Sequence, residues 1–253
     1  MATLDARTMV FDIDGTLCFD GRTIDPRIVS AIESGAESGF HMVFASARPI
    51  RDILPVLAGA FDSATLIGGN GTFVSIAGEV RARAAFAPAL VPTLLALITR
   101  YEATYIADGP WDYTYTGAPD HPIRNLLDQG KLARNVALHT HSQLIKFLIL
   151  TATDMHALAE DLRALGLSPY HHLDHNVIDL APALTTKWEA LSAIGHHDYI
   201  AFGNDINDID LLSNARHAIR VGNHPSLAAI AHTTVAPDSA AVAAEITRLT
   251  TTA

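Results

Sequence analysis

The chain has 253 residues, of which 49% are hydrophobic and 17% are charged, and its formal net charge is -10. These values are typical of a folded protein with a sizeable core and exclude extended disorder. The acidic balance argues against nucleic acid and a membrane surface as partners, because neither attracts a negatively charged protein. An anionic substrate would therefore need a local positive site.

Short apolar runs alternate with helical patterns in the first part of the chain, which is the order of β-α units around a parallel sheet. Three strands are expected, at residues 9–11, 42–45 and 65–67. A helix should begin with Asp25 and Pro26 and end before Gly39, and Pro49 can open the next helix. The right-handed crossover rule places the three strands side by side in a doubly wound sheet.

The segment from about residue 82 to residue 180 has a different pattern. We expect helices at about residues 90–101 and 155–165, strands at residues 147–150 and 177–180, and a Tyr-, Trp-, Gly- and Pro-rich segment at residues 105–122. This pattern is typical of a compact α+β insertion.

The β-α alternation returns after Pro182. The expected elements are a helix near residues 187–194, a strand at 199–202, a helix through 211–212, strands at 218–221 and 234–235, and a helix ending at 249. The sequence therefore predicts an α/β fold in which residues 1–81 and 181–253 form one domain and residues 82–180 form an inserted second domain.

Cys18 is the only cysteine, so no intrachain disulfide can form, and we expect it to be a small packing residue rather than a reactive thiol. The first residues lack the apolar core and the cleavage site of a signal peptide. No stretch approaches the ~18 apolar residues of a membrane span. We therefore expect a cytoplasmic protein.

Two carboxylates, Asp12 and Asp14, follow the first expected strand and precede a glycine turn at Gly15. Ligands of open α/β sheets bind just outside such strand ends. Both residues could instead be turn formers, but an aspartate directly behind an apolar strand would then be buried without a partner, which is costly. A bound metal would give the buried aspartate a partner, so the pair indicates an active site.

Three further elements fit the same site if they converge. Ser46 follows the second strand, where its hydroxyl and the next backbone N–H could hold phosphate oxygens. Lys187 opens a helix and is a compact charge suited to a phosphate, although such a lysine is more often a surface residue. The segment from Asn204 to Asp208 places four oxygen-bearing side chains after a buried strand, as magnesium prefers, although it could also be a polar turn.

In this order the four elements resemble the motifs of the haloacid dehalogenase-like (HAD) phosphatase superfamily, and in particular of its Cof-type sugar-phosphatase branch. The resemblance runs over nearly the whole chain and is most specific in the segment from Asp12 to Thr16, which matches the first motif. In the second motif Ala47 stands where this branch usually has glycine. In the fourth motif Asn204 stands where the family usually has aspartate, so one negative charge is missing and Asp205 is an alternative ligand.

The resemblance implies a Rossmann-like doubly wound core and an α/β cap, inserted between the second and third motifs, that selects the substrate. It implies Mg2+ as cofactor, Asp12 as the nucleophile that forms an aspartyl-phosphate, and Asp14 as the acid and then the base. The implied phosphate-binding residues are Gly15, Ser46, Ala47, Lys187 and Asn207. The implied metal ligands are Asp12, Asp14, Asn204, Asp205 and Asp208.

The expected substrate is a small phosphorylated metabolite, with sugar phosphates first. Trp111, Tyr113, Tyr115 and Arg124 could form a ring-binding wall, although aromatic residues in a small insertion are more often its core. A histidine-rich segment from His171 to His175, with Asp174, lacks a second ligand pair for zinc, so we expect a surface loop there. The pair His196 and His197 is interpreted in the same way.

Three alternatives remain beside the phosphatase. A receiver-type signalling domain also uses aspartate, a hydroxyl, lysine and magnesium, but such domains are half this length. A relative that binds phosphorylated ligands without turnover would fit the missing charge at Asn204. A phosphomutase would use the same intermediate. The sequence makes no prediction of oligomeric state.

Overall fold

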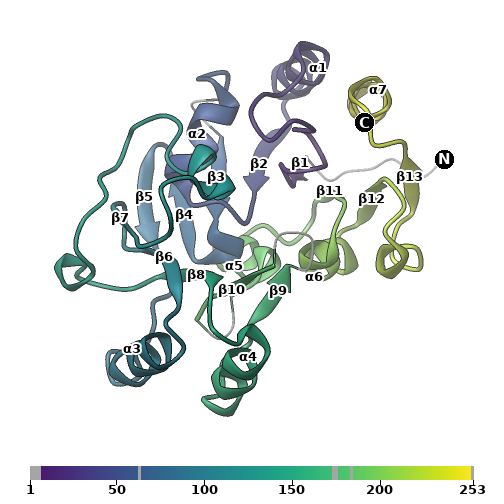
Figure 1. The fold of residues 1–253 in the computed structure, drawn as a ribbon. Coiled ribbons are helices and arrows are strands. Elements are labelled where there is room, and N and C mark those ends of the chain that lie inside the picture. Colours follow the sequence, from purple (N-terminus) through teal and green to yellow (C-terminus); the bar gives the residue numbers. More distant parts are fainter. Residues whose placement is uncertain (1–6, 62–63, 173–175, 183–184, 252–253) are drawn as a thin grey trace. The chain divides into compact units, whose positions relative to one another are not determined.

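The computed structural model describes residues 7–61, 64–172, 176–182 and 185–251. The chain divides into two compact units, which we call the core unit (Met1–Val80 and Thr186–Ala253) and the inserted unit (Arg81–Thr185). Figure 1 shows both units with their helices and strands labelled. No helix in the described ranges combines the length and apolar character that a membrane span requires.

The core unit is built on a twisted sheet of eight strands in the order β13-β12-β11-β1-β2-β3-β4-β5. The strands from β13 to β3 pair in parallel, and β4 pairs with β3 in the antiparallel sense. Their bounds are β1 (Thr8–Phe11), β2 (His41–Ala45), β3 (Thr65–Gly68), β4 (Phe73–Ile76), β5 (Glu79–Ala82), β11 (Ile200–Gly203), β12 (His217–Val221) and β13 (Thr233–Val235). The predicted doubly wound parallel sheet is confirmed.

Helices cover both faces of this sheet (Figure 1). One face carries α1 (Pro26–Glu37), α2 (Ile50–Leu57) and α7 (Ser239–Thr251), and the other carries α5 (Lys187–Ala193) and α6 (Ile209–Ser213). Asp25 caps α1 by accepting a hydrogen bond from the backbone N–H of Arg27, as its position before Pro26 predicted. Five short 3₁₀ turns complete the described elements, at Gly69–Gly71, Pro122–Asn125, Leu138–Thr140, Ile206–Asp208 and Pro225–Leu227.

Three phenylalanines, Phe11, Phe44 and Phe202, lie at matching positions near the carboxyl ends of β1, β2 and β11. The ring centroid of Phe11 is 5.9 Å from that of Phe44 and 5.0 Å from that of Phe202. All three are buried without exposed surface. Such aromatic packing fixes the three strand ends relative to one another, and the residues that follow them are those with predicted chemistry.

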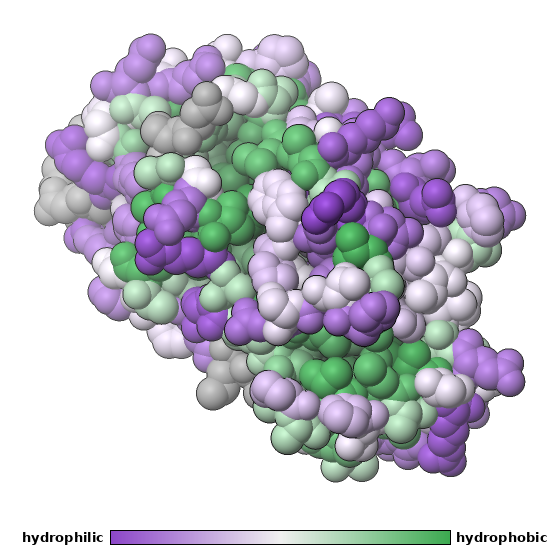
Figure 2. All heavy atoms as spheres, turned by 90° about the vertical axis from the view of Figure 1, so that its left-hand side faces the viewer, coloured by the Kyte–Doolittle hydropathy of each residue, from purple (hydrophilic) through white to green (hydrophobic). Residues whose placement is uncertain are grey.

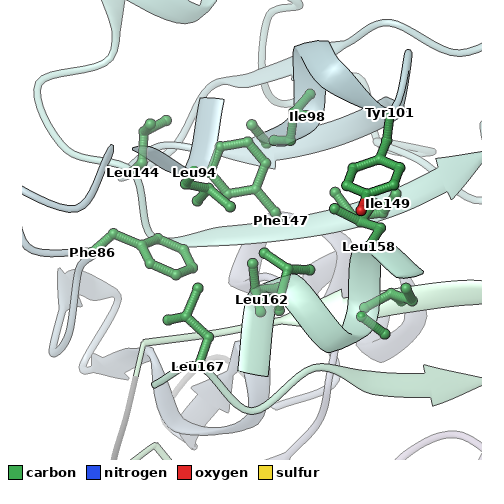
Figure 3. Close-up of a cluster of buried hydrophobic side chains, with 14 residues drawn as sticks. Phe86, Leu94, Ile98, Tyr101, Leu144, Phe147, Ile149, Leu158, Leu162 and Leu167 are labelled. Atoms are coloured by element: carbon green, nitrogen blue, oxygen red, sulfur yellow. The ribbon is translucent and has the colours of Figure 1, made fainter. Parts of the chain in front are cut away.

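The inserted unit is a five-stranded antiparallel sheet in the order β7-β6-β8-β10-β9, with two helices packed on one face. The elements are α3 (Val91–Arg100), β6 (Thr104–Asp108), β7 (Tyr113–Tyr115), β8 (Lys146–Thr151), α4 (Met155–Ala164), β9 (Tyr170–His172) and β10 (Val177–Leu180). Figure 3 shows Leu94 and Ile98 of α3 and Leu158 and Leu162 of α4 around Phe147. This cluster gives the unit a hydrophobic core of its own.

One prediction for the inserted unit is corrected, whereas Tyr113 and Tyr115 take the packing role that the sequence favoured. The aromatic-rich segment contains strands β6 and β7, and Tyr113 and Tyr115 pack against a second apolar cluster on the other face of the sheet. His171 and His172 belong to the edge strand β9 rather than to a loop, while Asp174 and His175 lie outside the described residues.

The face in Figure 2 carries hydrophobic areas that are separated by hydrophilic side chains.

Candidate active site

Polar and charged side chains gather at the carboxyl ends of adjacent parallel strands in the core unit. Asp12 follows β1, Ser46 follows β2 and Asn204 follows β11. The N–H of Asp12 donates to the carbonyl of Phe202 at 3.0 Å, so the pairing of β1 with β11 continues up to this residue. This edge of an open α/β sheet is where ligands bind.

Asp12, Lys187 and Asp208 form a buried network of charges. Lys187 Nζ lies 2.5 Å from Asp12 Oδ1 and 2.7 Å from Asp208 Oδ1. The three residues are 4%, 1% and 0% exposed. One cation therefore faces two carboxylates away from water, an arrangement that is expensive to build and is typical of functional sites.

The electrostatics of this network depend on burial. Burial raises the pKa of Asp12 to about 7 against the opposing charge of Lys187, and Asp208 and Asp14 add to the rise. Burial alone would lower the pKa of Lys187, but the two carboxylates raise it above its ordinary value. The two carboxylates therefore favour the charged form of Lys187, and burial disfavours the charged form of Asp12.

Local structure explains why the sequence brings these groups together. Thr186 caps α5 in a capping box with Glu189, which fixes Lys187 as the first helical residue. Asp208 Oδ2 accepts from the backbone N–H of Asn204 at 2.9 Å and of Asp205 at 3.2 Å. A Cβ at Gly203 would lie 2.7 Å from Asp208 Cβ, so this close approach needs glycine.

Oxygen atoms of the first and fourth motifs converge at the Asn204 amide. Asn204 Oδ1 accepts a hydrogen bond from Thr16 Oγ1 at 3.0 Å. The same atom lies 2.9 Å from Asp12 Oδ2 and 3.0 Å from the carbonyl oxygen of Asp14. Two arrangements satisfy these atoms. The amide can be turned so that its nitrogen donates to both acceptors, or its oxygen can share a cation with them.

The spacing fits magnesium. Octahedral coordination at about 2.0–2.1 Å puts neighbouring ligand oxygens about 3 Å apart, which matches the distances around the Asn204 amide. Among the described residues no group of three His, Cys, Asp or Glu side chains could hold a metal. A cation here would therefore depend on one carboxylate, one backbone carbonyl and one amide, which are all hard oxygen ligands.

The geometry does not favour two of the five predicted ligands. Both carboxylate oxygens of Asp208 are occupied by Lys187 and by backbone N–H groups. The carboxylate of Asp205 accepts from the N–H of Ile206 at 2.7 Å and lies 3.5 Å from His224 Nε2, and its side chain is 47% exposed. Asp208 is thus an anchor for the loop and Asp205 is turned to a different neighbour.

Asp14 is placed differently from Asp12. Its side chain is 46% exposed, and Arg48 holds both of its carboxylate oxygens, with Nε 2.8 Å from Oδ2 and Nη2 2.5 Å from Oδ1. Its backbone oxygen faces the Asn204 amide, as described above. The site therefore contains one buried carboxylate beside a lysine and one exposed carboxylate beside an arginine.

The predicted phosphate-binding residues have mixed positions. Ser46 Oγ accepts from the backbone N–H of Arg48 at 3.1 Å, so the hydroxyl hydrogen can be donated to a ligand. Ala47 lies between these two residues in the turn after β2. The N–H of Gly15 donates to the carbonyl of Cys18 at 2.9 Å, so it is engaged within its own turn and the geometry does not support the predicted phosphate contact.

Asn207 and Asn70 form a contact that the sequence did not predict. Asn207 Nδ2 donates to Asn70 Oδ1 at 3.1 Å, and the N–H of Asn70 donates to the carbonyl of Ser46 at 2.9 Å. Gly69, Asn70 and Gly71 all have positive φ (58°, 55° and 102°), a conformation that asparagine adopts more readily than most other residues with a side chain.

Other candidates lie outside this cluster. Cys18 is buried, and burial raises the pKa of its thiol to about 11, as expected for a packing residue rather than a reactive thiol. His196 is half-buried and stacks on His41 with ring centroids 4.8 Å apart, whereas the neighbouring His197 is exposed, as expected for a surface loop. Trp111 donates to the carbonyl of Leu132, and Arg124 lies over the Tyr115 ring.

Comparison with known proteins gives a consistent result. The model of the haloacid dehalogenase-like hydrolase family matches residues 9–246. The HMP-PP phosphatase of Yersinia enterocolitica is 24% identical over 243 residues, which cover 86% of this chain and 84% of the relative.

Solved structures share the fold over nearly the whole chain. A haloacid dehalogenase-like hydrolase from Bacteroides thetaiotaomicron superposes with a TM-score of 0.83 at 21% identity, covering 97% of this chain and 100% of the other. A HAD subclass IIB sugar phosphatase superposes with a TM-score of 0.77 at 18% identity, covering 96% and 98%.

Proposed function

The chain belongs to the haloacid dehalogenase-like hydrolase family, and we propose that it is a magnesium-dependent phosphatase of small phosphomonoesters that forms an aspartyl-phosphate on Asp12. The observation that carries this proposal is the buried contact of Lys187 with Asp12 and Asp208. Two residues after Asp12, the carboxylate of Asp14 is exposed. A buried nucleophile and an exposed proton carrier are the two carboxylates that this reaction needs.

Asp12 is the nucleophile in this proposal. Its carboxylate is fixed by Lys187 on Oδ1, and Oδ2 faces the Asn204 amide. A phosphate monoester dianion repels a carboxylate, so positive charge must be present before the oxygen of Asp12 can reach phosphorus. Lys187 supplies one such charge within the buried network.

A magnesium ion would be held by Asp12, the backbone oxygen of Asp14 and Asn204. When bound, it would supply positive charge that offsets the repulsion between the carboxylate and the phosphate and would act as a Lewis acid on the phosphoryl group. Because Asn204 contributes no negative charge, we expect weaker binding than an aspartate at this position would give.

Two groups are suited to the remaining phosphate oxygens. An ammonium group has three N–H donors, and the two carboxylates occupy two of those of Lys187. The third can bind a phosphate oxygen. The hydroxyl hydrogen of Ser46 is the second donor, because its oxygen is already held by the backbone of the same turn.

Asp14 moves the proton. In the first step the Asp12 oxygen bonds to phosphorus, the bond from phosphorus to the leaving oxygen breaks, and protonated Asp14 gives its proton to that oxygen. In the second step the Asp14 carboxylate takes a proton from water, which attacks phosphorus and releases phosphate from Asp12. Its exposure lets it reach the leaving group and the water.

The proposed substrates are small phosphorylated metabolites, with sugar phosphates first. The relative named above is an HMP-PP phosphatase and one structural neighbour is a sugar phosphatase, which supports this class without selecting one compound. The net charge of -10 makes nucleic acid and anionic membranes poor partners. That residues 82–180 act as a substrate-selecting cap, and that the protein is cytoplasmic, stay predictions.

Phosphate release from a panel of sugar phosphates, other phosphomonoesters and an aryl phosphate tests the proposal. Wild type and Asp12→Asn would be compared with magnesium and with chelator, and circular dichroism would verify the fold of the variant. We expect release only from wild type with magnesium. Stoichiometric binding without release would point to a phospho-ligand-binding protein, and transfer to a second sugar hydroxyl would point to a phosphomutase.

A further inference from the structure

Arg48 makes three hydrogen bonds that connect the turn after β2 to the loop after β1. Its guanidinium donates to Asp14 Oδ2 at 2.8 Å, to Asp14 Oδ1 at 2.5 Å and to the carbonyl of Gly21 at 2.9 Å. Asp14 is therefore held through both oxygens. A bidentate pair fixes the plane of a carboxylate as well as its position, which a lysine cannot do.

Arg48 is the fixed member of the pair. Its side chain is 14% exposed, against 46% for Asp14. Its backbone is held at both ends, because its N–H donates to Ser46 Oγ and its carbonyl accepts from the N–H of Gly69 at 2.8 Å. Arg48 thus determines where the exposed carboxylate points, rather than the reverse.

The pair leaves lone pairs of the Asp14 carboxylate accessible. Each carboxylate oxygen has two lone pairs, and Arg48 uses one on each oxygen. The remaining lone pairs can take and give the proton of the proposed reaction. An unheld aspartate of this exposure would sample several rotamers, and misplaced catalytic groups lose much of their effect.

We propose that Arg48 is a positioning residue that acts on the reaction through Asp14, by holding the carboxylate in the orientation needed for proton transfer. The inference rests on the proposed function, because it concerns the proton carrier of that reaction. Arg48 binds neither the transferred phosphoryl group nor the metal in this account. Its effect should therefore exist only where Asp14 has a proton to move.

Two consequences distinguish this role from others. A substrate with a poor leaving group, such as an alkyl phosphate, needs the acid, whereas an aryl phosphate with a good leaving group needs it much less. In addition, two residues that act as one unit have non-additive effects. If Arg48 instead contacted the phosphate directly, or only linked the loop to Gly21, its replacement would slow the reaction of both substrates. The rate loss would then multiply with the rate loss caused by replacing Asp14.

The test measures release of the leaving alcohol in single turnover, with enzyme in excess over an alkyl or an aryl phosphate. The enzymes are wild type, Arg48→Gln, Asp14→Asn and the double variant. Arg27→Gln is the matched control, because Arg27 forms a similar two-pronged pair with Asp25 on the surface of the same unit. Thermal unfolding verifies that each variant is folded.

We expect Arg48→Gln to slow release of the alcohol from the alkyl phosphate by about 10–100-fold, which is a part of the 10²–10⁴-fold that a positioned acid contributes. Release from the aryl phosphate should slow by less than about threefold. The double variant should be no slower than Asp14→Asn, and Arg27→Gln should match wild type. Equal slowing of both substrates, or multiplied losses in the double variant, would overturn the inference.

Two further observations keep the test decisive. If Arg48→Gln does not fold, Arg48→Lys keeps the positive charge without the two-pronged contact, and the same leaving-group difference is expected. If wild type releases no alcohol with magnesium, the proposed function fails. If wild type is active and Asp14→Asn is slow while neither Arg48 variant is, only the role of Arg48 fails.

Discussion

Replacing Asn204 by aspartate should change both the stability of the protein and its response to magnesium. The new carboxylate oxygen would stand 2.9 Å from Asp12 Oδ2 and 3.0 Å from the carbonyl oxygen of Asp14. Two unit charges 2.9 Å apart repel by about 6 kcal/mol at an effective dielectric constant of about 20. Rotation of the side chains and the sharing of a proton reduce this, so we expect a loss of about 2–4 kcal/mol without metal.

Magnesium should reverse the loss, because the variant offers the ion one more negative ligand. Thermal unfolding would be followed in chelator and across a magnesium titration. In chelator we expect Asn204→Asp to melt about 5–15 °C below wild type, since 1 kcal/mol corresponds to about 2–4 °C in a chain of this size. Its half-saturating magnesium concentration should be at least about tenfold lower, or about 1.4 kcal/mol tighter.

Asp205→Asn is the matched control, because the Asp205 carboxylate faces His224 and the N–H of Ile206. We expect its magnesium titration to match that of wild type. The reasoning is refuted if Asn204→Asp is as stable as wild type in chelator and binds magnesium no more tightly. A response lost in Asp205→Asn would assign the ligand to Asp205 instead.

Three further predictions concern stability, the rate of phosphate release and the pH dependence of stability. Lys187→Met should lower the free energy of unfolding by about 3–5 kcal/mol in urea, because two buried carboxylates lose their shared cation, and a loss below about 1 kcal/mol would contradict this. Gly71→Ala places a Cβ against the carbonyl oxygen that precedes Lys187, so phosphate release should fall by about tenfold or more, an estimate based on the cost of misplacing catalytic groups. Gly78→Ala, which also has positive φ but open space around it, should leave the rate unchanged. Burial and the stacked ring of His41 lower the pKa of His196, so the unfolded chain binds the proton more readily and stability should fall as the pH drops below about 6.5. His196→Gln should remove that part of the pH dependence in unfolding measurements, and an unchanged profile would contradict the assignment.

The strand ends that carry the site were predictable because their sequence signals are local. Asp12 directly follows an apolar run, and Lys187 follows the threonine that caps its helix. Glycine at position 203 and the polar residues after it likewise mark a turn behind a strand. Parallel pairing of the strands then brings these ends together, as the crossover rule requires.

The contacts within the site could not be predicted, because they join residues far apart in sequence. The orientation of Asp14 is determined by Arg48, 34 positions away, and the choice between Asn204 and Asp205 depends on the register of β1 with β11. The local pattern only showed two neighbouring oxygen-bearing side chains in one loop. Which of them faces Asp12 is a property of the folded chain.

Two of the strands that the sequence analysis did not predict, β5 and β7, have weak local patterns. The segment Glu79–Ala82 of β5 carries charged residues at alternate positions, which protects a sheet edge but does not indicate a strand. The three-residue strand β7 at Tyr113–Tyr115 lies in a segment rich in turn-forming residues. Both strands exist because a neighbouring strand pairs with them.

The most direct test of the account is detection of the covalent intermediate. Asp14→Asn enzyme would be mixed with an aryl phosphate and magnesium, quenched in acid, digested and analysed by mass spectrometry. Loss of the proton acceptor should let the phospho-enzyme accumulate, so the peptide that contains Asp12 should gain the mass of one phosphoryl group, and Asp12→Asn should show no gain. Alcohol release without this modification, or modification of another residue, would contradict Asp12 as the nucleophile.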